Sequence, residues 1–162
     1  MNDLSKILET KTKIRFQDCD PFNHLNNARY LDYYINARED QLIEYYNLDL
    51  FKIIREQALG WVVSNSQVSY IKPVFTMEEI IIDSKLIQFS SKHLTIEARM
   101  WNHDKTTLKS FCWINFVHFN LKTNMVENHS NDFMQLFKTV HKPIDEALFT
   151  EREKHYRLKS NK

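Results

Sequence analysis

Two aspartates, a histidine and two asparagines lie close together in the chain, between a predicted strand and a predicted helix; they are Asp18, Asp20, His24, Asn26 and Asn27. A strand that ends in acids, followed by a helix N-terminus whose free N–H groups can face an anion, is a catalytic arrangement in principle. Asp18 is expected only to hold the loop. The carboxylate of Asp20 could act as a general base or attack a carbonyl carbon directly. A helix that begins near Asn27 would present free backbone N–H groups, which stabilise a developing oxyanion. The alternative is that these residues only cap a turn, because Asp and Asn are common in loops.

The surrounding sequence predicts a strand, a loop and a helix that would hold these residues in place. Apolar and polar residues alternate over 11–18, which is typical of a strand. Pro21 fits the start of a loop, and Asn23 stands where a left-handed backbone conformation could be needed. Asn26 is expected to be the N-cap of the helix, because its side chain can accept a hydrogen bond from a free N–H of the first turn.

A long helix is predicted over 27–46 from its periodicity. Its apolar residues recur mostly at steps of three and four, which is typical of an amphipathic helix; they are Leu31, Tyr34, Ile35, Leu42, Tyr45 and Tyr46. A second short helix is predicted over 49–57, and Gly60 is expected to break it.

The rest of the chain predicts an antiparallel sheet followed by further helices. Runs rich in β-formers alternate with short polar turns, so these runs are expected to pair as antiparallel neighbours. The predicted strands are 61–72, 79–89, 93–102 and 107–120, and the predicted helices are 132–140 and 144–157, separated by Pro143. On the first of these strands, Val62, Ser64, Ser66, Val68 and Tyr70 are expected to share one face. The fold class is therefore α+β, with 1–128 as one domain and 129–162 as its helical extension.

Composition and charge exclude several classes of protein. With 162 residues, of which 43% are hydrophobic, the chain has enough apolar material for one folded domain. The 22 basic and 21 acidic residues give a net charge of +1, so neither nucleic acid nor a membrane surface is expected as a partner. Two cysteines and seven scattered histidines lack the spacing of a disulfide framework or a metal site, and no metal or cofactor is expected. No signal peptide or membrane span is evident, and a cytoplasmic location is expected.

The segment from Asp18 to Leu31, DCDPFNHLNNARYL, resembles the signature of the hotdog-fold thioesterases, which include the 4-hydroxybenzoyl-CoA thioesterase family and the acyl-ACP thioesterases. The later segment 68–74, VSYIKPV, resembles a strand of this family that commonly ends in Pro after an aromatic residue, and the resemblance covers 11–122. It implies a hotdog fold, in which a curved antiparallel sheet wraps a long central helix. It also implies a homodimer or a dimer of dimers, with two sheets joined edge to edge and active sites at the subunit interface.

The resemblance also implies roles for individual residues. Asp20 matches the family's catalytic carboxylate, which acts either as a nucleophile or as a general base. The backbone N–H of Asn27 would polarise the carbonyl oxygen. His24 would orient the substrate or assist proton transfer, with a purely structural role as its alternative. The candidate substrate-binding residues are Asn23, Asn26 and Tyr30. Alternatively, the two asparagines only shape the loop, and Tyr30 belongs to the core.

The function implied by the resemblance is an acyl-CoA thioesterase, with an acyl-ACP thioesterase as the close alternative. Departures from the family pattern leave a non-catalytic acyl-CoA-binding protein as a rival, because Asn23 replaces a glycine, Asn36 replaces an acid and 77–79 replaces a Gly-Asp turn. A hotdog hydratase or dehydratase ranks last, since such enzymes usually place their His and acid in a different local pattern.

Three further questions stay open at the level of sequence. The basic residues Lys72, Lys92 and Arg99 could meet the phosphates of coenzyme A or could simply be solvated surface. The acyl chain length does not follow from the residues. The segment 129–162 could cover the sheet, cap the acyl pocket or contact a second dimer.

Overall fold

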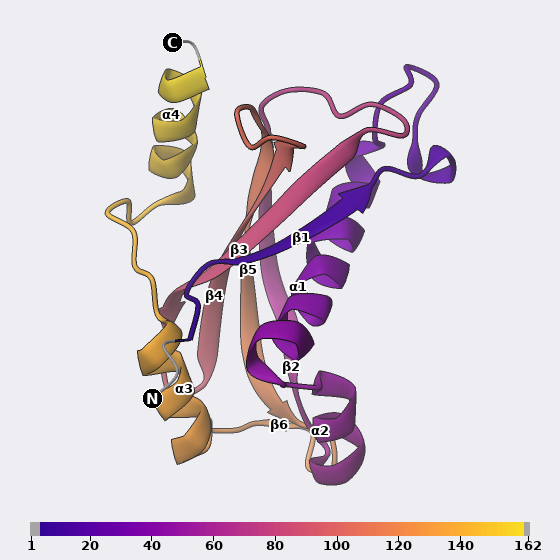
Figure 1. Ribbon diagram of the computed structural model, residues 1–162. Coiled ribbons are helices and arrows are strands. Elements are labelled where there is room, and N and C mark those ends of the chain that lie inside the picture. The colour runs from indigo at the N-terminus through magenta and orange to yellow at the C-terminus, as the bar shows by residue number, and fades with distance from the viewer. Residues whose placement is uncertain (1–3, 161–162) are drawn as a thin grey trace.

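The computed structural model describes residues 4–160, which form one curved antiparallel sheet with helices on both of its faces (Figure 1). The strands are β1 (Leu8–Lys13), β2 (Leu59–Tyr70), β3 (Glu79–Phe89), β4 (His93–Asn102), β5 (Leu108–Asn120) and β6 (Met125–Val126). They lie in the order β1-β3-β4-β5-β2, every pair is antiparallel, and the short β6 pairs with β5. The predicted α+β class and hotdog arrangement are confirmed.

The central helix begins with a 3₁₀ turn, Asn27–Arg29, and continues as α1, Tyr30–Tyr46. The sheet curves around this helix (Figure 1). It thereby covers the apolar face that the helical periodicity of 27–46 predicts, which must be buried. The core between α1 and the sheet includes Tyr30, Tyr34, Ala37, Val74, Ile80, Ile82, Ala98, Met100, Cys112 and Ile114. Each fully buried aliphatic side chain among them contributes roughly 1.5–3 kcal/mol.

The first strand lies earlier in the chain than the sequence predicts. β1 ends at Lys13, which pairs with Glu79, the first residue of β3, so beyond Lys13 the chain has no partner strand. The residues Phe16–Asp18, expected within the strand, form a 3₁₀ turn instead, and the side chain of Phe16 is 78% exposed. The predicted strand over 11–18 is therefore wrong in its second half.

The second helix ends at a different residue from the predicted Gly60. α2, Leu50–Gln57, is capped at its start by Asp49, whose side chain accepts from the N–H of Lys52. It ends at Ala58, which adopts the left-handed conformation with φ 56°. Gly60 lies inside β2 instead, where a Cβ atom would come within 3.3 Å of Ile54, so its lack of a side chain lets α2 pack closely on the strand.

A bulge changes which residues of β2 face the central helix. The pairing of β2 with β5 shifts register between Val63 and Asn65. Because one extra residue reverses the alternation, Trp61 and Val63 face α1 in the first half of the strand, and Val68 does so in the second half. The prediction that Val62 shares a face with Val68 is therefore wrong.

The two C-terminal helices pack on the sheet in different places. α3, Asn131–Val140, contributes Phe137 and Val140 to a cluster on the α1 side of the sheet. α4, Phe149–Ser160, lies on the opposite side (Figure 1), where Phe149 stacks on Phe111 of β5. Arg152 of α4 forms a two-bonded ion pair with Glu97 of β4, at 2.8 Å for each bond. No helix of residues 4–160 is both long and apolar enough to cross a membrane.

A histidine pair fastens the start of α3 to the sheet. The imidazole of His129 accepts a hydrogen bond from Trp61 Nε1 at 3.0 Å, so its Nδ1 carries the proton donated to the carbonyl of Ser90. Its ring stacks on that of His118 at 4.7 Å, and burial lowers the pKa of His129. A proton on Nε2 would therefore break the bond from Trp61.

In the folded protein the pKa of His129 lies below the ordinary histidine value of 6.5. As the pH drops below 6.5, His129 is therefore protonated more readily in the unfolded chain than in the folded protein, and we expect the free energy of unfolding to fall. Above pH 6.5 neutral His129 makes its full contribution to the free energy of unfolding. In His129→Gln, whose amide offers the same donor and acceptor without titrating, this dependence should flatten. Urea unfolding at several pH values measures it, with exposed His103→Gln as the control; equal pH profiles for the two variants would contradict the prediction.

Candidate active site

Four of the six candidate site residues line one groove at the start of the central helix. The groove has a volume of about 350 Å³ and is lined by Asp20, His24, Leu25, Asn27, Tyr30, Tyr70, Ile71, Lys72 and Pro73. The loop before α1 supplies the acid and the histidine, and the end of β2 supplies the opposite wall. The fold thus brings Asp20, His24, Asn27 and Tyr30 together.

The carboxylate of Asp20 is held through one of its oxygens. Oδ1 accepts hydrogen bonds from the N–H groups of Phe22 at 2.9 Å and His24 at 3.2 Å. The Asp20 N–H donates to the His24 carbonyl at 2.8 Å, which closes the loop on itself. No described residue donates a hydrogen bond to Oδ2. One carboxylate oxygen is therefore fixed, while the other is free to bind a water or a substrate.

A neighbouring segment supports this loop from outside. The Leu25 N–H donates to the Val74 carbonyl at 2.8 Å, and the Thr76 N–H donates to the Asn23 carbonyl at 3.1 Å. The imidazole of His24 packs edge-on against Phe75, with ring centroids 5.1 Å apart. These contacts fix the direction of the His24 ring beside the groove.

The start of the helix presents a free donor to the same groove. The side chain of Asn26 accepts from the Ala28 N–H at 3.0 Å, which confirms its predicted capping role. The N–H of Asn27 makes no hydrogen bond within residues 4–160, and the partial positive charge of the helix N-terminus adds to its strength as a donor. This arrangement is chemically suited to stabilising an oxyanion.

Asn23, Asn26 and Tyr30 occupy three different environments. Asn23 adopts the predicted left-handed conformation, with φ 64°, and does not line the groove. Asn26 does not line the groove either, and its side-chain oxygen serves as the cap. Tyr30 is 4% exposed, belongs to the core and also forms part of the groove wall.

Residues that the motif analysis did not single out also shape the site. Tyr70 packs edge-on against Tyr30 at 4.9 Å and donates from its hydroxyl to the Asn27 carbonyl at 3.0 Å. Its signal in the sequence is its place just before Pro73 in the segment 68–74. Tyr33 of α1 donates to Asp18 Oδ2 at 2.7 Å and accepts from the Arg15 N–H at 2.9 Å, so it fastens the start of the loop to the helix.

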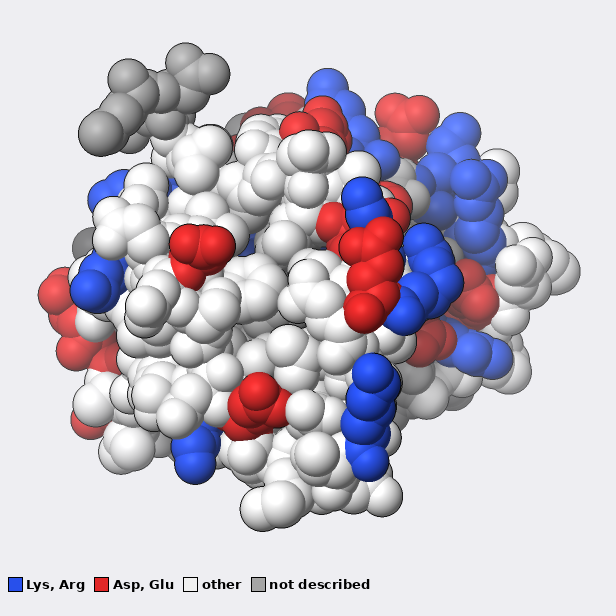
Figure 2. Space-filling view, turned by 90° about the horizontal axis from the view of Figure 1, so that it is seen from below, with Lys and Arg blue, Asp and Glu red and all other residues white. Residues whose placement is uncertain are grey.

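The basic residues considered for phosphate binding have different surroundings. Lys72 lines the groove, whereas Arg99 is engaged on the outer face of the sheet by two hydrogen bonds to Asp83, at 2.7 and 2.8 Å. Figure 2 shows Lys and Arg side chains beside Asp and Glu side chains, without a large area of one sign on this face. Within residues 4–160, no group of three or more His, Cys, Asp or Glu side chains is placed to hold a metal ion.

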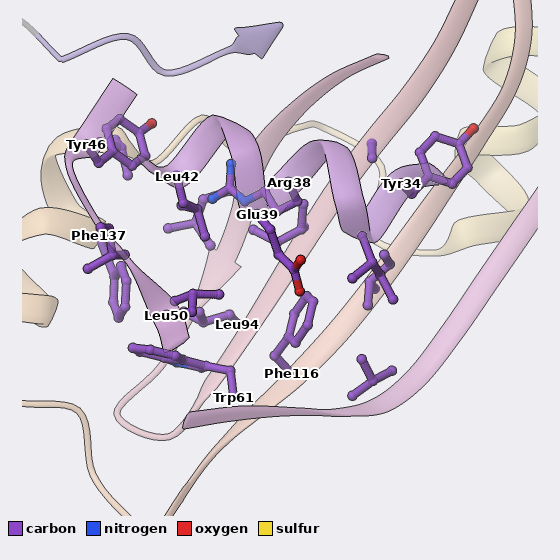
Figure 3. Close-up of a pocket in the computed structure, with 18 of the residues that line it drawn as sticks. Tyr34, Arg38, Glu39, Leu42, Tyr46, Leu50, Trp61, Leu94, Phe116 and Phe137 are labelled. Atoms are coloured by element: carbon purple, nitrogen blue, oxygen red, sulfur yellow. The ribbon is translucent and has the colours of Figure 1, made fainter. Parts of the chain in front are cut away.

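An apolar cavity of about 190 Å³ lies further along α1, between this helix and the sheet (Figure 3). Tyr34 lies at one end of the close-up, and Tyr46, Trp61 and Phe137 lie at the other. Among the polar side chains of the wall, Arg38 donates to Ser84 at 3.0 Å, and burial lowers its pKa to about 10. The cavity could hold an apolar group whose reactive end lies at the start of the helix.

Comparisons with known proteins show the family of this chain. The profile of the Thioesterase-like superfamily matches residues 14–148. The long-chain acyl-CoA thioesterase FadM of Escherichia coli is 29% identical over 116 residues, which are 72% of this chain and 86% of that protein. The crystal structure of YbaW, a probable thioesterase from Escherichia coli, superposes with a TM-score of 0.71 at 26% identity, covering 83% of this chain and 99% of that one.

A more distant structure shows likeness of fold alone. The DHNA-CoA thioesterase of Staphylococcus aureus has a TM-score of 0.75 at 15% identity, and the match covers 83% of this chain and 90% of that one. The family profile begins just after β1 and spans the groove, the central helix, the strands β2 to β6 and α3, and it ends where α4 begins. The chain therefore belongs to the thioesterase-like superfamily, with the hotdog fold that its sequence predicts.

Proposed function

We propose that this protein hydrolyses acyl-CoA thioesters to a free acid and coenzyme A. The observation that carries the proposal is the meeting of a free carboxylate oxygen of Asp20 and the free N–H of Asn27 in one groove, in a chain of the thioesterase-like superfamily. Hydrolysis needs these two elements, namely a base or nucleophile for the carbonyl carbon and a donor for its oxygen.

In the proposed reaction, the thioester oxygen accepts a hydrogen bond from the Asn27 N–H. In one route, Asp20 Oδ2 takes a proton from a water as the water oxygen attacks the carbonyl carbon, and the C–S bond breaks when the tetrahedral intermediate collapses to the free acid. In the other route, Oδ2 itself attacks, the C–S bond breaks to leave a mixed anhydride with Asp20, and water then hydrolyses this anhydride. In both routes the departing thiolate takes up a proton to give the coenzyme A thiol. His24 lies beside the groove, where it orients the carbonyl group or passes that proton.

The surroundings of the groove indicate where each half of the substrate would lie. The apolar cavity along α1 would receive the acyl group, because it removes apolar surface from water. Lys72 would face the phosphates of coenzyme A, since it is the basic side chain among the described residues that line the groove. The name of the similar FadM, a long-chain acyl-CoA thioesterase, supports an acyl-CoA substrate here.

The proposal is tested by thiol release from a panel of short, medium, long-chain and aromatic acyl-CoAs. We expect turnover on at least one member, and the preferred member identifies the substrate class. Turnover on acyl-ACP but not on acyl-CoA would show that the carrier of the acyl group is ACP rather than coenzyme A. Binding of acyl-CoA, seen as thermal stabilisation, without thiol release from either carrier would overturn it in favour of a binding protein.

We also propose that two copies join through β2 to form a homodimer. This twelve-residue strand pairs only with β5 in the described chain and carries no charged residue along its length. The other edge strand, β1, carries Glu9, Lys11 and Lys13, and such charges protect a sheet edge against pairing. The uncharged edge of β2, with Val62 48% exposed, suits a second copy of the same strand.

Val62→Lys is expected to convert the dimer into monomers, because it places a charge from each copy near the joint between the two strands. Size-exclusion chromatography with light scattering measures the mass, and a wild-type mass of four chains would indicate a dimer of dimers. Thr12→Lys on the opposite edge is the matched control and should leave the mass unchanged. A monomeric wild type would contradict the proposed interface.

A further inference from the structure

The apolar cavity runs along the central helix away from the catalytic groove. Tyr34, Leu42 and Tyr46 of α1 line it in succession. With a rise of 1.5 Å per residue, Tyr46 lies about 24 Å along the helix from Tyr30 at the groove. An acyl group whose carbonyl lies at Asn27 would therefore approach the far end of the cavity only if its chain is long.

α3 forms one wall at the far end of the cavity. Phe137 and Val140 of this helix line the cavity, are 6% and 3% exposed, and pack with Trp61 and Tyr46 in one cluster. In Figure 3 the ring of Phe137 stands beside Leu50 and Trp61, at the end opposite Tyr34. α3 thus forms a wall across the path that an extended chain would follow.

This wall is fastened at both of its ends. Before α3, the His129 N–H donates to the Ser91 carbonyl at 2.7 Å, and the Ser130 side chain caps the helix. After α3, His141 Nε2 bonds to the Ile87 carbonyl at 2.9 Å, and the Lys142 N–H donates to the Leu86 carbonyl at 2.9 Å. Because these bonds tie both ends to the sheet, the wall resists displacement by a chain that is too long.

Two polar groups beside α3, on Trp61 and Tyr46, are directed to other partners. Trp61 donates its Nε1 proton to His129, and the hydroxyl of Tyr46 donates to the Ser5 carbonyl at 2.6 Å. Trp61, Phe137 and Val140 therefore offer carbon to a chain end, whereas Arg38 and Glu39 are the charged side chains of the cavity wall. A cavity of about 190 Å³ is larger than the engineered apolar cavity of about 150 Å³ that binds benzene.

We infer that Phe137 of α3 is the stop that sets the maximum acyl chain length. This inference rests on the proposed thioesterase function. α3 is therefore a specificity element for the reaction at Asp20, although it contacts neither Asp20 nor the reacting carbonyl in the described groove.

The test compares kcat/KM over even-numbered saturated acyl-CoAs for the wild type and Phe137→Ala. Removing the ring opens the wall, so the preferred length should increase. The ratio of kcat/KM for the next longer chain to that for the wild-type optimum should rise at least about tenfold, since one methylene in an apolar pocket is worth about 10–200-fold. Val140→Leu, which adds volume at the same wall, should shift the preference to shorter chains.

Phe133→Ala is the matched control, because Phe133 stacks on Phe137 within α3 but does not line the cavity. Binding of free fatty acids of the same lengths, measured by calorimetry, reports on the wall without any turnover. Absence of hydrolysis together with length-dependent binding that shifts in Phe137→Ala would overturn the proposed function and leave the stop in place. Identical length profiles for the wild type, Phe137→Ala and Val140→Leu would overturn the stop, as would an equal shift in Phe133→Ala.

Discussion

Asp20→Asn is expected to lower turnover by roughly 10²–10⁴-fold while leaving the fold unchanged, which is the contribution typical of a positioned acid–base group. The amide oxygen of the new side chain can still accept the hydrogen bonds from Phe22 and His24, so the loop should keep its shape. Its other end is an NH₂ group, which can neither accept a proton from water nor attack a carbonyl carbon. The loss should therefore fall on the chemical step.

The measurement is kcat and KM from thiol release, together with the melting temperature of each variant. Asp32→Asn is the matched control, because Asp32 lies in the first turn of the same helix but pairs with Arg29 on the surface. We expect this control to keep wild-type kcat. If Asp20→Asn retained wild-type turnover, Asp20 would be neither the base nor the nucleophile.

Glu97→Gln is expected to destabilise the protein by about 3–5 kcal/mol, the cost typical of removing one partner from a buried ion pair. Glu97 is fully buried and bonds Arg152 at 2.8 Å through both of its oxygens, with Lys85 at 3.2 Å. Trp113 Nε1 and the Tyr156 hydroxyl also donate to this carboxylate. A neutral side chain would leave the positive charges of Arg152 and Lys85 without their counter-charge in the interior.

The same residue predicts the direction of an acid effect. Burial alone would raise the pKa of Glu97, but the hydrogen bonds from Arg152 and the charge of Lys85 outweigh it and lower the pKa to about 2. The ionised carboxylate of Glu97 therefore makes its full contribution to the free energy of unfolding above its ordinary pKa of 4.5, and this contribution is lost as the pH falls toward 2. Urea unfolding over this range should show a steeper loss in the wild type than in Glu97→Gln.

Glu79→Gln is the control for this effect, because the side chain of Glu79 is 71% exposed and its ion pair with Lys13 is loose, at 3.7 Å. Surface pairs of this kind are worth about 0–1 kcal/mol. If Glu97→Gln were no less stable than Glu79→Gln, the attachment of α4 to the sheet would depend on the aromatic contacts of Phe149 rather than on the ion pair.

Local sequence was enough to predict the elements whose causes are local. The helical periodicity of 27–46 required a long helix with one buried face, and Tyr30 and Tyr34 lie in that face. Asn26 and Asn23 have side chains suited to a helix cap and to a left-handed turn, and they take those places. Four of the candidate residues meet in one groove because the loop is too short to separate them.

Where strand pairing decides the structure, the local pattern misled. The alternation that predicted a strand to residue 18 continues past Lys13, but the partner strand β3 has ended there. The bulge of β2 after Val63 arises from its pairing with β5, and as a result Val63 rather than Val62 lines the cavity beside α1. Ala58 ends α2 in a conformation that its residue type does not favour, because the chain must turn there into β2.

The sequence by itself determined the family, the central helix and the loop that carries Asp20, because each depends on residues that are near neighbours in the chain. Only the tertiary structure decided which partners those residues meet. Tyr70 reaches the Asn27 carbonyl across 43 positions, and Glu97 meets Arg152 across 55. Phe137 lies at the end of the cavity beside Trp61 for the same reason. Contacts of this range depend on how the sheet curves and where the last two helices pack, and no local pattern of residue types contains that information.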